Sequence, residues 1–241
     1  MKPRRLIARA AAAEIVAVRR GVRHRPGPIG LRAFVAVAVA ALGVIIAPRA
    51  LADTGCGPGG PPPEAASKNV SDVYSQPATL WLTNTIVGIT TAGGYGEAAV
   101  GSASPIERRA LLIDAQQDGN HQIIVDAGRE ALLYTVSGCT ITPVVDQHDA
   151  RFGLDRGHFQ GKGDGVGCSD LGDGRHLVQL LQLPDGRTVR RAEIDLNGAT
   201  ATIGRSDTVT ATSDQDPAWT TAGTISCGEE TIDQDGVQAG Y

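Results

Sequence analysis

The chain has few aromatic residues and, beyond its first 52 positions, few positive charges. Phe, Trp and Tyr make up 4% of the 241 residues, which disfavours a platform of stacked aromatic rings. The first 52 residues carry ten Lys and Arg and one acid, whereas the other 189 carry 12 bases and 25 acids, a net charge near −13. Positive charge supplies most of the affinity for nucleic acid and for anionic lipid. We therefore predict that the protein binds neither.

Several signatures of catalysis and metal binding are also missing. The sequence has no G-x-S-x-G elbow, no P-loop, no dinucleotide-binding fingerprint and no HExxH. It also lacks the Cys/His spacings that are typical of zinc sites. With 25 acids available, the presence of a carboxylate pair says nothing about glycosidase chemistry. We predict a protein that is not an enzyme. The alternative is a small secreted hydrolase that uses carboxylates and a histidine such as His158.

The uncharged, strongly apolar run at residues 33–47 is too short for a membrane-spanning helix. As a helix it would measure roughly 22 Å against a hydrocarbon core of ~30 Å. Arginines precede this run and Ala50-Leu51-Ala52 follows it, which is the order of a secretory signal peptide. We predict that residues 1–52 are cleaved after Ala52, leaving a secreted or envelope protein without a stable membrane span. An uncleaved anchor is the alternative, and a true start near Val22 would explain the long basic segment.

All four cysteines lie in the predicted exported part of the chain: Cys56, Cys139, Cys168 and Cys227. An even number of cysteines outside the cytosol favours two disulfides. Four cysteines allow three connectivities. Proximity in the sequence favours Cys139–Cys168, which leaves Cys56–Cys227 to hold the two ends of the domain together.

The exported part divides into a short lead-in and a β-rich domain. Residues 53–68 are rich in Pro and Gly and predict a flexible, partly extended lead-in. Residues 69–241 show short runs of Val, Ile, Leu and Thr between turn residues, and no long amphipathic helix. We predict an all-β domain with a hairpin turn at Asn197-Gly198. The predicted strands are 79–83, 85–90, 110–114, 122–126, 131–136, 140–145, 176–183, 188–196, 199–203 and 208–212.

A weak internal repeat runs through this domain. The stretches around Asp118 and Asp173, 55 positions apart, each read strand, Asp-Gly loop, His, strand, turn, strand. This spacing suits a four-stranded propeller blade with its loops. Roughly 170 foldable residues hold three such units, fewer than the four to eight blades of a usual propeller. We predict a small or incomplete β-propeller-like array of antiparallel blades, preceded by a helical signal peptide.

The Asp-rich loop followed by an apolar strand resembles FG-GAP/VCBS-type repeats, whose loops commonly read DxDxDG. The best match is DAQQDGN at 114–120, followed by HQIIV at 121–125. The stretch 163–175, GDGVGCSDLGDGR, is similar to secreted actinobacterial members of this type. The resemblance covers residues 105–236 and implies an exported protein with propeller-like repeats.

The resemblance also implies weak calcium binding, because loops of this family often hold Ca²⁺ with six to eight oxygen ligands. On the family's pattern the first loop supplies Asp114, Gln116 and Asp118 through side chains, Asn120 through its carbonyl and Gln122 at the ninth position. Amides replace two expected carboxylates, which lowers affinity. The second loop, with Asp170 and Asp173, is one position short and weaker. The alternative is that both loops are ordinary Asx-type turns.

Two aromatic residues, Tyr74 and Trp219, are candidates for contact with a ligand, and core filling is the alternative for each. Trp81, within TLWLTN, is expected to fill the core. The function that these observations favour is a non-enzymatic binding or structural protein of the cell envelope or extracellular space. Its partner is an unknown envelope protein or glycan.

Overall fold

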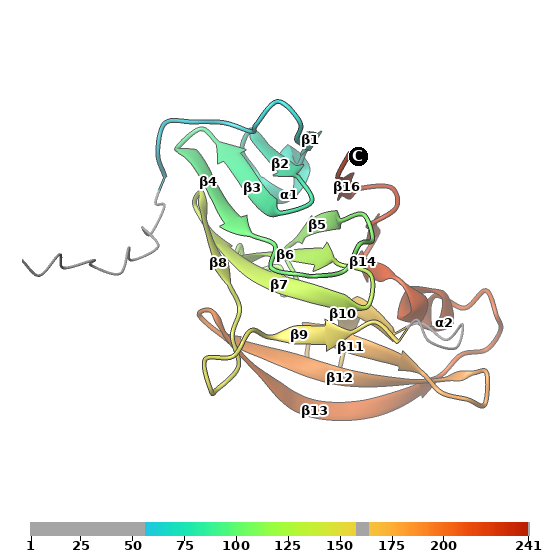
Figure 1. The fold of residues 1–241 in the computed structure, drawn as a ribbon. Helices are drawn as coiled ribbons and strands as arrows, with labels where there is room; N and C mark the ends of the chain where they lie inside the picture. Colours follow the sequence, from blue (N-terminus) through green and yellow to red (C-terminus); the bar gives the residue numbers. More distant parts are fainter. Residues whose placement is uncertain (1–55, 158–163, 241) are drawn as a thin grey trace, which may run out of the picture. The chain divides into compact units, whose positions relative to one another are not determined.

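A computed structural model describes residues 56–157 and 164–240 (Figure 1). The predicted signal peptide, residues 1–52, lies outside the described residues, and so does His158. Within them, no helix is both long and apolar enough to cross a membrane. The described part is mostly β-strand, with the single-turn helices α1 (Ser71–Tyr74) and α2 (Pro217–Thr220). The all-β prediction is confirmed at this level.

Twelve strands form three antiparallel units, each made of four strands that follow one another in the sequence (Figure 1). The first unit consists of β1 (Ala66–Asn69), β2 (Ala78–Leu82), β3 (Ile86–Thr91) and β4 (Gly94–Ala99). The second consists of β5 (Arg109–Ile113), β6 (His121–Asp126), β7 (Glu130–Ser137) and β8 (Thr140–Pro143). The third consists of β10 (Asp164–Asp170), β11 (Arg175–Gln182), β12 (Thr188–Asn197) and β13 (Thr200–Thr210). The described strands form three sheets and not a closed barrel or propeller.

Short strands complete the edges of the second and third sheets. After β13 the chain returns as β14 (Ile225–Cys227), which pairs in parallel with β10 and carries β15 (Glu230–Thr231) on its other side. It ends in β16 (Val237–Gln238), antiparallel to β5, while β9 (Gly153–Asp155) pairs with β7. The first strands of both repeats therefore have partners on both sides, which removes two open sheet edges.

The second sheet separates two hydrophobic cores. Along β5, Ala110 and Leu112 belong to the core shared with the first sheet, while Leu111 and Ile113 belong to the core shared with the third. Successive side chains of a strand point to opposite faces, so a strand covered on both faces must be apolar throughout. This explains the unbroken run of buried residues from Ala110 to Ile113.

Other segments pack on parts of the outer faces of the first and third sheets. On the first sheet, Trp81 is fully buried and stacks on Tyr95, with ring centroids 6.0 Å apart; the core-filling prediction for Trp81 is confirmed. Gly59 lies against the Tyr95 ring, since a Cβ at this position would sit 2.4 Å from it. On the third sheet, α2 brings Trp219 against a small cluster around Val178.

The segment predicted as a lead-in is attached to the first and second sheets. Cys56 forms a disulfide with Cys139, and Gly57 exchanges backbone hydrogen bonds of 3.2 Å with Tyr95. The first strand begins at Ala66, inside the predicted lead-in of 53–68. The Pro/Gly-rich composition did not indicate these attachments, which depend on partners far away in the sequence.

The predicted disulfide pairing is wrong. The structure pairs Cys56 with Cys139 and Cys168 with Cys227, with Cα–Cα distances of 5.3 and 4.6 Å. Cys139 lies in the turn after β7 and Cys168 in β10, so the two belong to different sheets although they are close in the sequence. Cys168 meets Cys227 because β10 and β14 pair side by side, with Gly167 opposite Ser226.

Candidate functional site

The loop between β5 and β6 is held together by hydrogen bonds to its own carboxylates. Asp114 accepts from the backbone N–H groups of Asp118 and Gly119, at 3.1 and 2.9 Å. Asp118 in turn accepts from the backbone N–H and the side-chain amide of Asn120, which lowers the pKa of Asp118. Gly119 has a φ of +83°, a conformation that favours glycine. These bonds build the Asx-type turn that the alternative prediction described.

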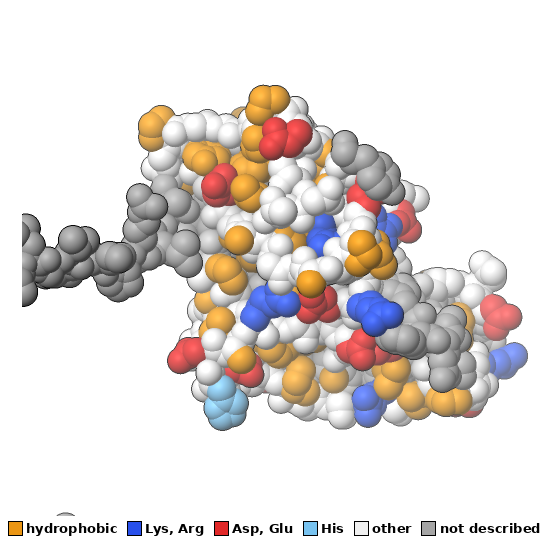
Figure 2. Space-filling model, in the orientation of Figure 1, with side chains coloured by type: hydrophobic (Ala, Val, Ile, Leu, Met, Phe, Trp, Pro, Cys, Tyr) orange, Lys and Arg blue, Asp and Glu red, His pale blue; other side chains and the backbone are white. Residues whose placement is uncertain are grey.

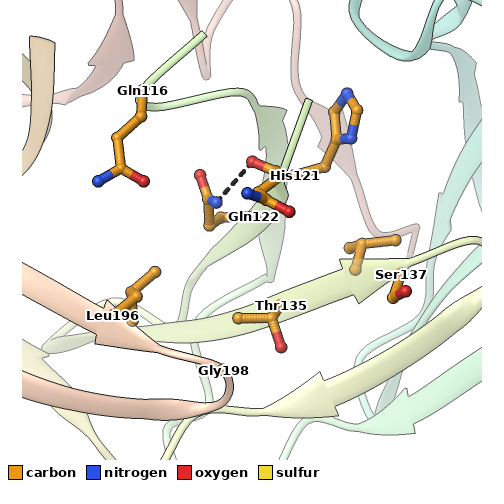
Figure 3. A pocket seen from close by; sticks show the side chains of 9 residues that line it. Gln116, His121, Gln122, Thr135, Ser137, Leu196 and Gly198 are labelled. Carbon is orange, nitrogen blue, oxygen red and sulfur yellow. Dashed lines mark hydrogen bonds between the residues drawn. The ribbon is translucent and has the colours of Figure 1, made fainter. Parts of the chain in front are cut away.

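Gln122 links the two ends of the loop through hydrogen bonds. Its side chain is almost fully buried, accepts from the backbone N–H of Ala115 at 3.1 Å and donates to the carbonyl of Asn120 at 2.6 Å (Figure 3). The Asn120 carbonyl, a predicted calcium ligand, therefore already has a donor in this arrangement. Among the described residues, no group of three or more His, Cys, Asp or Glu side chains is arranged to hold a metal ion. Calcium binding stays a prediction.

A cavity of about 250 Å³ lies between this loop and the β12–β13 hairpin (Figure 3). We call it the loop pocket. Its lining comes from the β5–β6 loop, β6, β7 and the hairpin, and so from both predicted repeats. The lining residues are Gln116, Asn120, His121, Gln122, Thr135, Val136, Ser137, Leu196 and Gly198.

The lining of the loop pocket is part polar and part apolar, and it carries no carboxylate, guanidinium or ammonium group. The side chains of Gln116, Thr135 and Ser137 have no hydrogen-bond partner in the part of the chain that the structure describes. Leu196 supplies an apolar wall and packs against the core between the second and third sheets. The pocket thus offers free amide and hydroxyl groups beside one aliphatic surface.

His121 and Tyr74 lie behind the pocket. Neighbouring residues of a strand point to opposite faces, so the His121 ring points away from Gln122 (Figure 3). Its Nε2 lies 3.0 Å from the carbonyl oxygen of Val73, and its ring centroid lies 4.5 Å from that of Tyr74. The Tyr74 hydroxyl donates to the carbonyl of Gly138, and burial raises its pKa. In this structure Tyr74 supports His121 and α1.

The second predicted loop is engaged in different contacts. Asp170 accepts from the backbone N–H groups of Gly172 and Gly174, at 2.7 and 3.3 Å. Asp173 instead pairs with Arg205, which lowers the pKa of Asp173, and with His176. The structure therefore does not bring Asp170 and Asp173 together around one point.

His176 is the centre of a network of hydrogen bonds and ion pairs that the sequence did not reveal. Its Nδ1 lies 2.6 Å from Glu193 Oε1, and its Nε2 lies 3.0 Å from Asp173 Oδ1. The other Glu193 oxygen accepts from Arg205 Nε at 3.1 Å. Because both ring nitrogens face carboxylates, neither is directed at a substrate. The network links β11, β12 and β13 across the outer face of the third sheet.

Trp219, the other aromatic candidate, is half-buried at the end of α2. It packs against the cluster around Val178, and its carbonyl accepts a hydrogen bond of 2.9 Å from Gln182. This placement matches the core-filling alternative. On the face seen in Figure 2, acidic and basic side chains of the described part are interspersed, without a continuous basic area.

Compared with protein-family models, curated proteins and solved structures, the chain matches none of them. The FG-GAP/VCBS resemblance therefore stays a prediction. The structure does give the two predicted repeats the same local architecture: an Asp-rich loop joins the first and second strands of an antiparallel four-stranded unit in both.

The sequence indicated one side of the loop pocket and missed the other. Gln116, Asn120 and Gln122 stood out because they belong to the Asp-rich motif. Thr135, Ser137 and Leu196 carry no motif and reach the pocket only through sheet packing. The Asn197-Gly198 turn was predicted, but its place opposite the β5–β6 loop was not.

Proposed function

We propose that the protein is an exported, non-enzymatic binding module of the cell envelope or extracellular space, and that the loop pocket is its ligand site. The observation that carries this proposal is the cavity of about 250 Å³ with three polar side chains that lack partners in the described part. Gln116 and Ser137 are exposed and Thr135 is half-buried, so their amide and hydroxyl groups are accessible to a ligand that enters the cavity. The two disulfides and the predicted signal peptide support export.

The same proposal treats the three four-stranded units as degenerate blades of the FG-GAP/VCBS type. Each unit is antiparallel and uses consecutive strands, and the two Asp-rich loops occupy equivalent positions. A hydrophobic core lies between each successive pair of sheets, as face-to-face blades require. In this proposal the ligand site lies where the second and third units meet.

Binding to the envelope of the cells that secrete the protein tests the proposed site. The processed protein is collected from a host that secretes it and is incubated with isolated envelope fragments. Ser137→Trp places a large ring in the loop pocket, whereas Thr208→Trp makes the same change at an exposed position of β13. We expect Ser137→Trp to abolish sedimentation with the fragments and Thr208→Trp to leave it unchanged. Equal binding of both variants, or no binding of the wild type, would contradict the proposal.

Weak calcium binding at the β5–β6 loop is a second part of the proposal. Counted from Asp114, Gly119 is the sixth residue, where calcium loops need a glycine for the sharp turn. Two carboxylates, Asp114 and Asp118, suggest an affinity no better than the ~10⁻³ M of extracellular modules. We expect calorimetric heat with CaCl₂ that Asp118→Asn removes. Absence of both heat and a calcium-dependent melting shift would retire this part.

A further inference from the structure

We infer that the loop pocket takes one neutral sugar ring, as a terminal or branch residue of a glycan. This inference rests on the proposed function and specifies the ligand of the same site. It starts from a contrast in charge: residues 53–241 carry a net charge near −13, whereas none of the nine lining residues is Asp, Glu, Lys or Arg. Moving a charged group into a site without a counter-charge is costly. The lining therefore selects against ionic ligands.

The free polar groups of the pocket suit ligand hydroxyls better than ligand groups that can only donate or only accept hydrogen bonds. An amide such as that of Gln116 both donates and accepts, and the hydroxyls of Thr135 and Ser137 do the same. Sugar hydroxyls have this dual character too. An apolar ligand would leave these groups buried without partners, which is unfavourable. The chemistry of the lining thus favours a ligand with several hydroxyl groups.

The shape of the pocket favours a ring with an apolar face. The side chains of Gln116, Thr135 and Leu196 surround the same open space, with Gln122 at its back (Figure 3). Leu196 offers aliphatic surface to the C–H groups of a sugar ring, while the amide and the hydroxyl face its edge. Gln122 is already fixed by Ala115 and Asn120, so it forms a rigid floor.

The volume limits the ligand to a small group. Pockets for drug-sized ligands usually measure about 300–1,000 Å³, and the loop pocket measures about 250 Å³. One six-membered ring with its hydroxyls is the largest unit that we expect inside. The rest of a glycan would extend into solvent past the Asn197-Gly198 turn.

Nuclear magnetic resonance of the ¹⁵N-labelled processed protein tests this inference. The probes are D-glucose, D-galactose, D-mannose and N-acetylglucosamine, with sodium glucuronate as a charged counterpart and mannitol as an acyclic one. A neutral oligosaccharide released from the envelope distinguishes a glycan from a free sugar, because extra contacts would make it bind more tightly than its monosaccharide. We expect saturable shifts at 116–122, 135–137 and 196–198, with a dissociation constant on the order of 1 mM, and at least tenfold weaker binding of glucuronate and mannitol.

Three variants locate the binding. Gln116→Ala and Thr135→Val are expected to weaken sugar binding at least fivefold, whereas Thr208→Val, on the exposed part of β13, is expected to leave it unchanged. No shift with any neutral sugar, shifts confined to other residues, or equal affinity for glucuronate would overturn the inference. If the sugars fail while Ser137→Trp still abolishes envelope binding, the ligand class is wrong but the proposed site stands. If Ser137→Trp also binds the envelope normally, both fail.

Discussion

At the scale of single residues, Glu230, which lies beside the β5–β6 loop, carries a negative charge that is unfavourable in the folded state. Glu230 lies with Asp114 and Arg175 around a second hollow beside the loop. Burial, followed by the charge of Asp235, raises the pKa of Glu230 above its ordinary value of 4.5. The folded state therefore holds the Glu230 proton more tightly than the unfolded state does. Ionisation of Glu230 lowers stability as the pH rises above about 4.5.

We expect Glu230→Gln to stabilise the protein at pH 7 and to have little effect at pH 4. Since the side chain is partly exposed, solvent screening limits the gain to about 1 kcal/mol or less. Thermal unfolding of both proteins at the two pH values measures this difference. A variant that is less stable than the wild type at pH 7 would contradict the assignment of Glu230 as an unfavourable, partly buried charge.

Some residues of the candidate site belong to a motif that the sequence shows, whereas others reach the site only through the packing of the strands. Asp114 and Asp118 were recognisable, and the structure shows their carboxylates bonded within their own loop. Thr135 and Ser137 lie on the face of β7 toward the third sheet, a position fixed by the pairing of β7 with β6 and β8. A single sequence does not show that a threonine and a serine in a strand line a pocket, because this role depends on how β7 pairs with β6 and β8.

Strands were predictable where apolar residues form nearly continuous runs. The runs at 110–114, 122–126 and 131–136 became β5, β6 and β7 with small shifts of their ends. The predicted strands 199–203 and 208–212 form one strand, β13, with a register shift opposite 192–194. Its middle residues are polar and exposed, so the hydrophobic pattern breaks although the backbone continues.

The strand β10 was missed because its Asp and Gly residues are typical of a loop. Gly165 and Gly167 are needed here for close approach: a Cβ at Gly167 would lie 1.9 Å from the Ser226 carbonyl oxygen, and one at Gly165 would lie 2.7 Å from that of Ala222. Glycine in a strand often marks such contacts. The C-terminal segment that makes them was itself too short and polar to stand out.

The closing strand β16 gives a prediction at the element scale. Val237 is 4% exposed and pairs with Ala110, whereas its neighbour Gln238 points outward. We expect Val237→Asp to destabilise the protein by about 2–4 kcal/mol, since it buries an unpaired charge and frees the edge of β5. Gln238→Asp, the matched control, removes only an exposed hydrogen bond to Glu107 and adds a charge that water screens, so it should cost no more than about 1 kcal/mol. Urea unfolding measures both, and equal effects would contradict the role assigned to β16.

The described part of the molecule is a stack of three sheets in which disulfides attach both ends of the domain. Cys56–Cys139 attaches the segment before β1 to the second sheet, and Cys168–Cys227 attaches the returning chain to the third. The sequence indicated two disulfides and an all-β domain, but it gave no sign that residues 66–99 form a four-stranded sheet of their own. It could not indicate the pairing of the cysteines, because that depends on the path of β14 and on the Pro/Gly-rich segment.

Removing the disulfide of the third sheet should weaken the stack. In the chain-entropy model a cross-link that spans 59 residues contributes about 4 kcal/mol. We expect Cys168→Ser combined with Cys227→Ser to lower the free energy of unfolding by an amount near this, measured by urea unfolding under oxidising conditions. A loss below about 1 kcal/mol would show that β14 is held on β10 without the covalent link.

The central claim at the scale of the whole molecule is that the contact between the second and third units forms the ligand site. Hydrogen-exchange mass spectrometry of the processed protein, with and without neutral oligosaccharide released from the envelope, tests it most directly. We predict slower exchange confined to peptides that cover 116–122, 135–137 and 196–198. Protection confined to the outer face of the third sheet, in peptides that cover 173–176 and 203–207, or unchanged exchange throughout would contradict the claim.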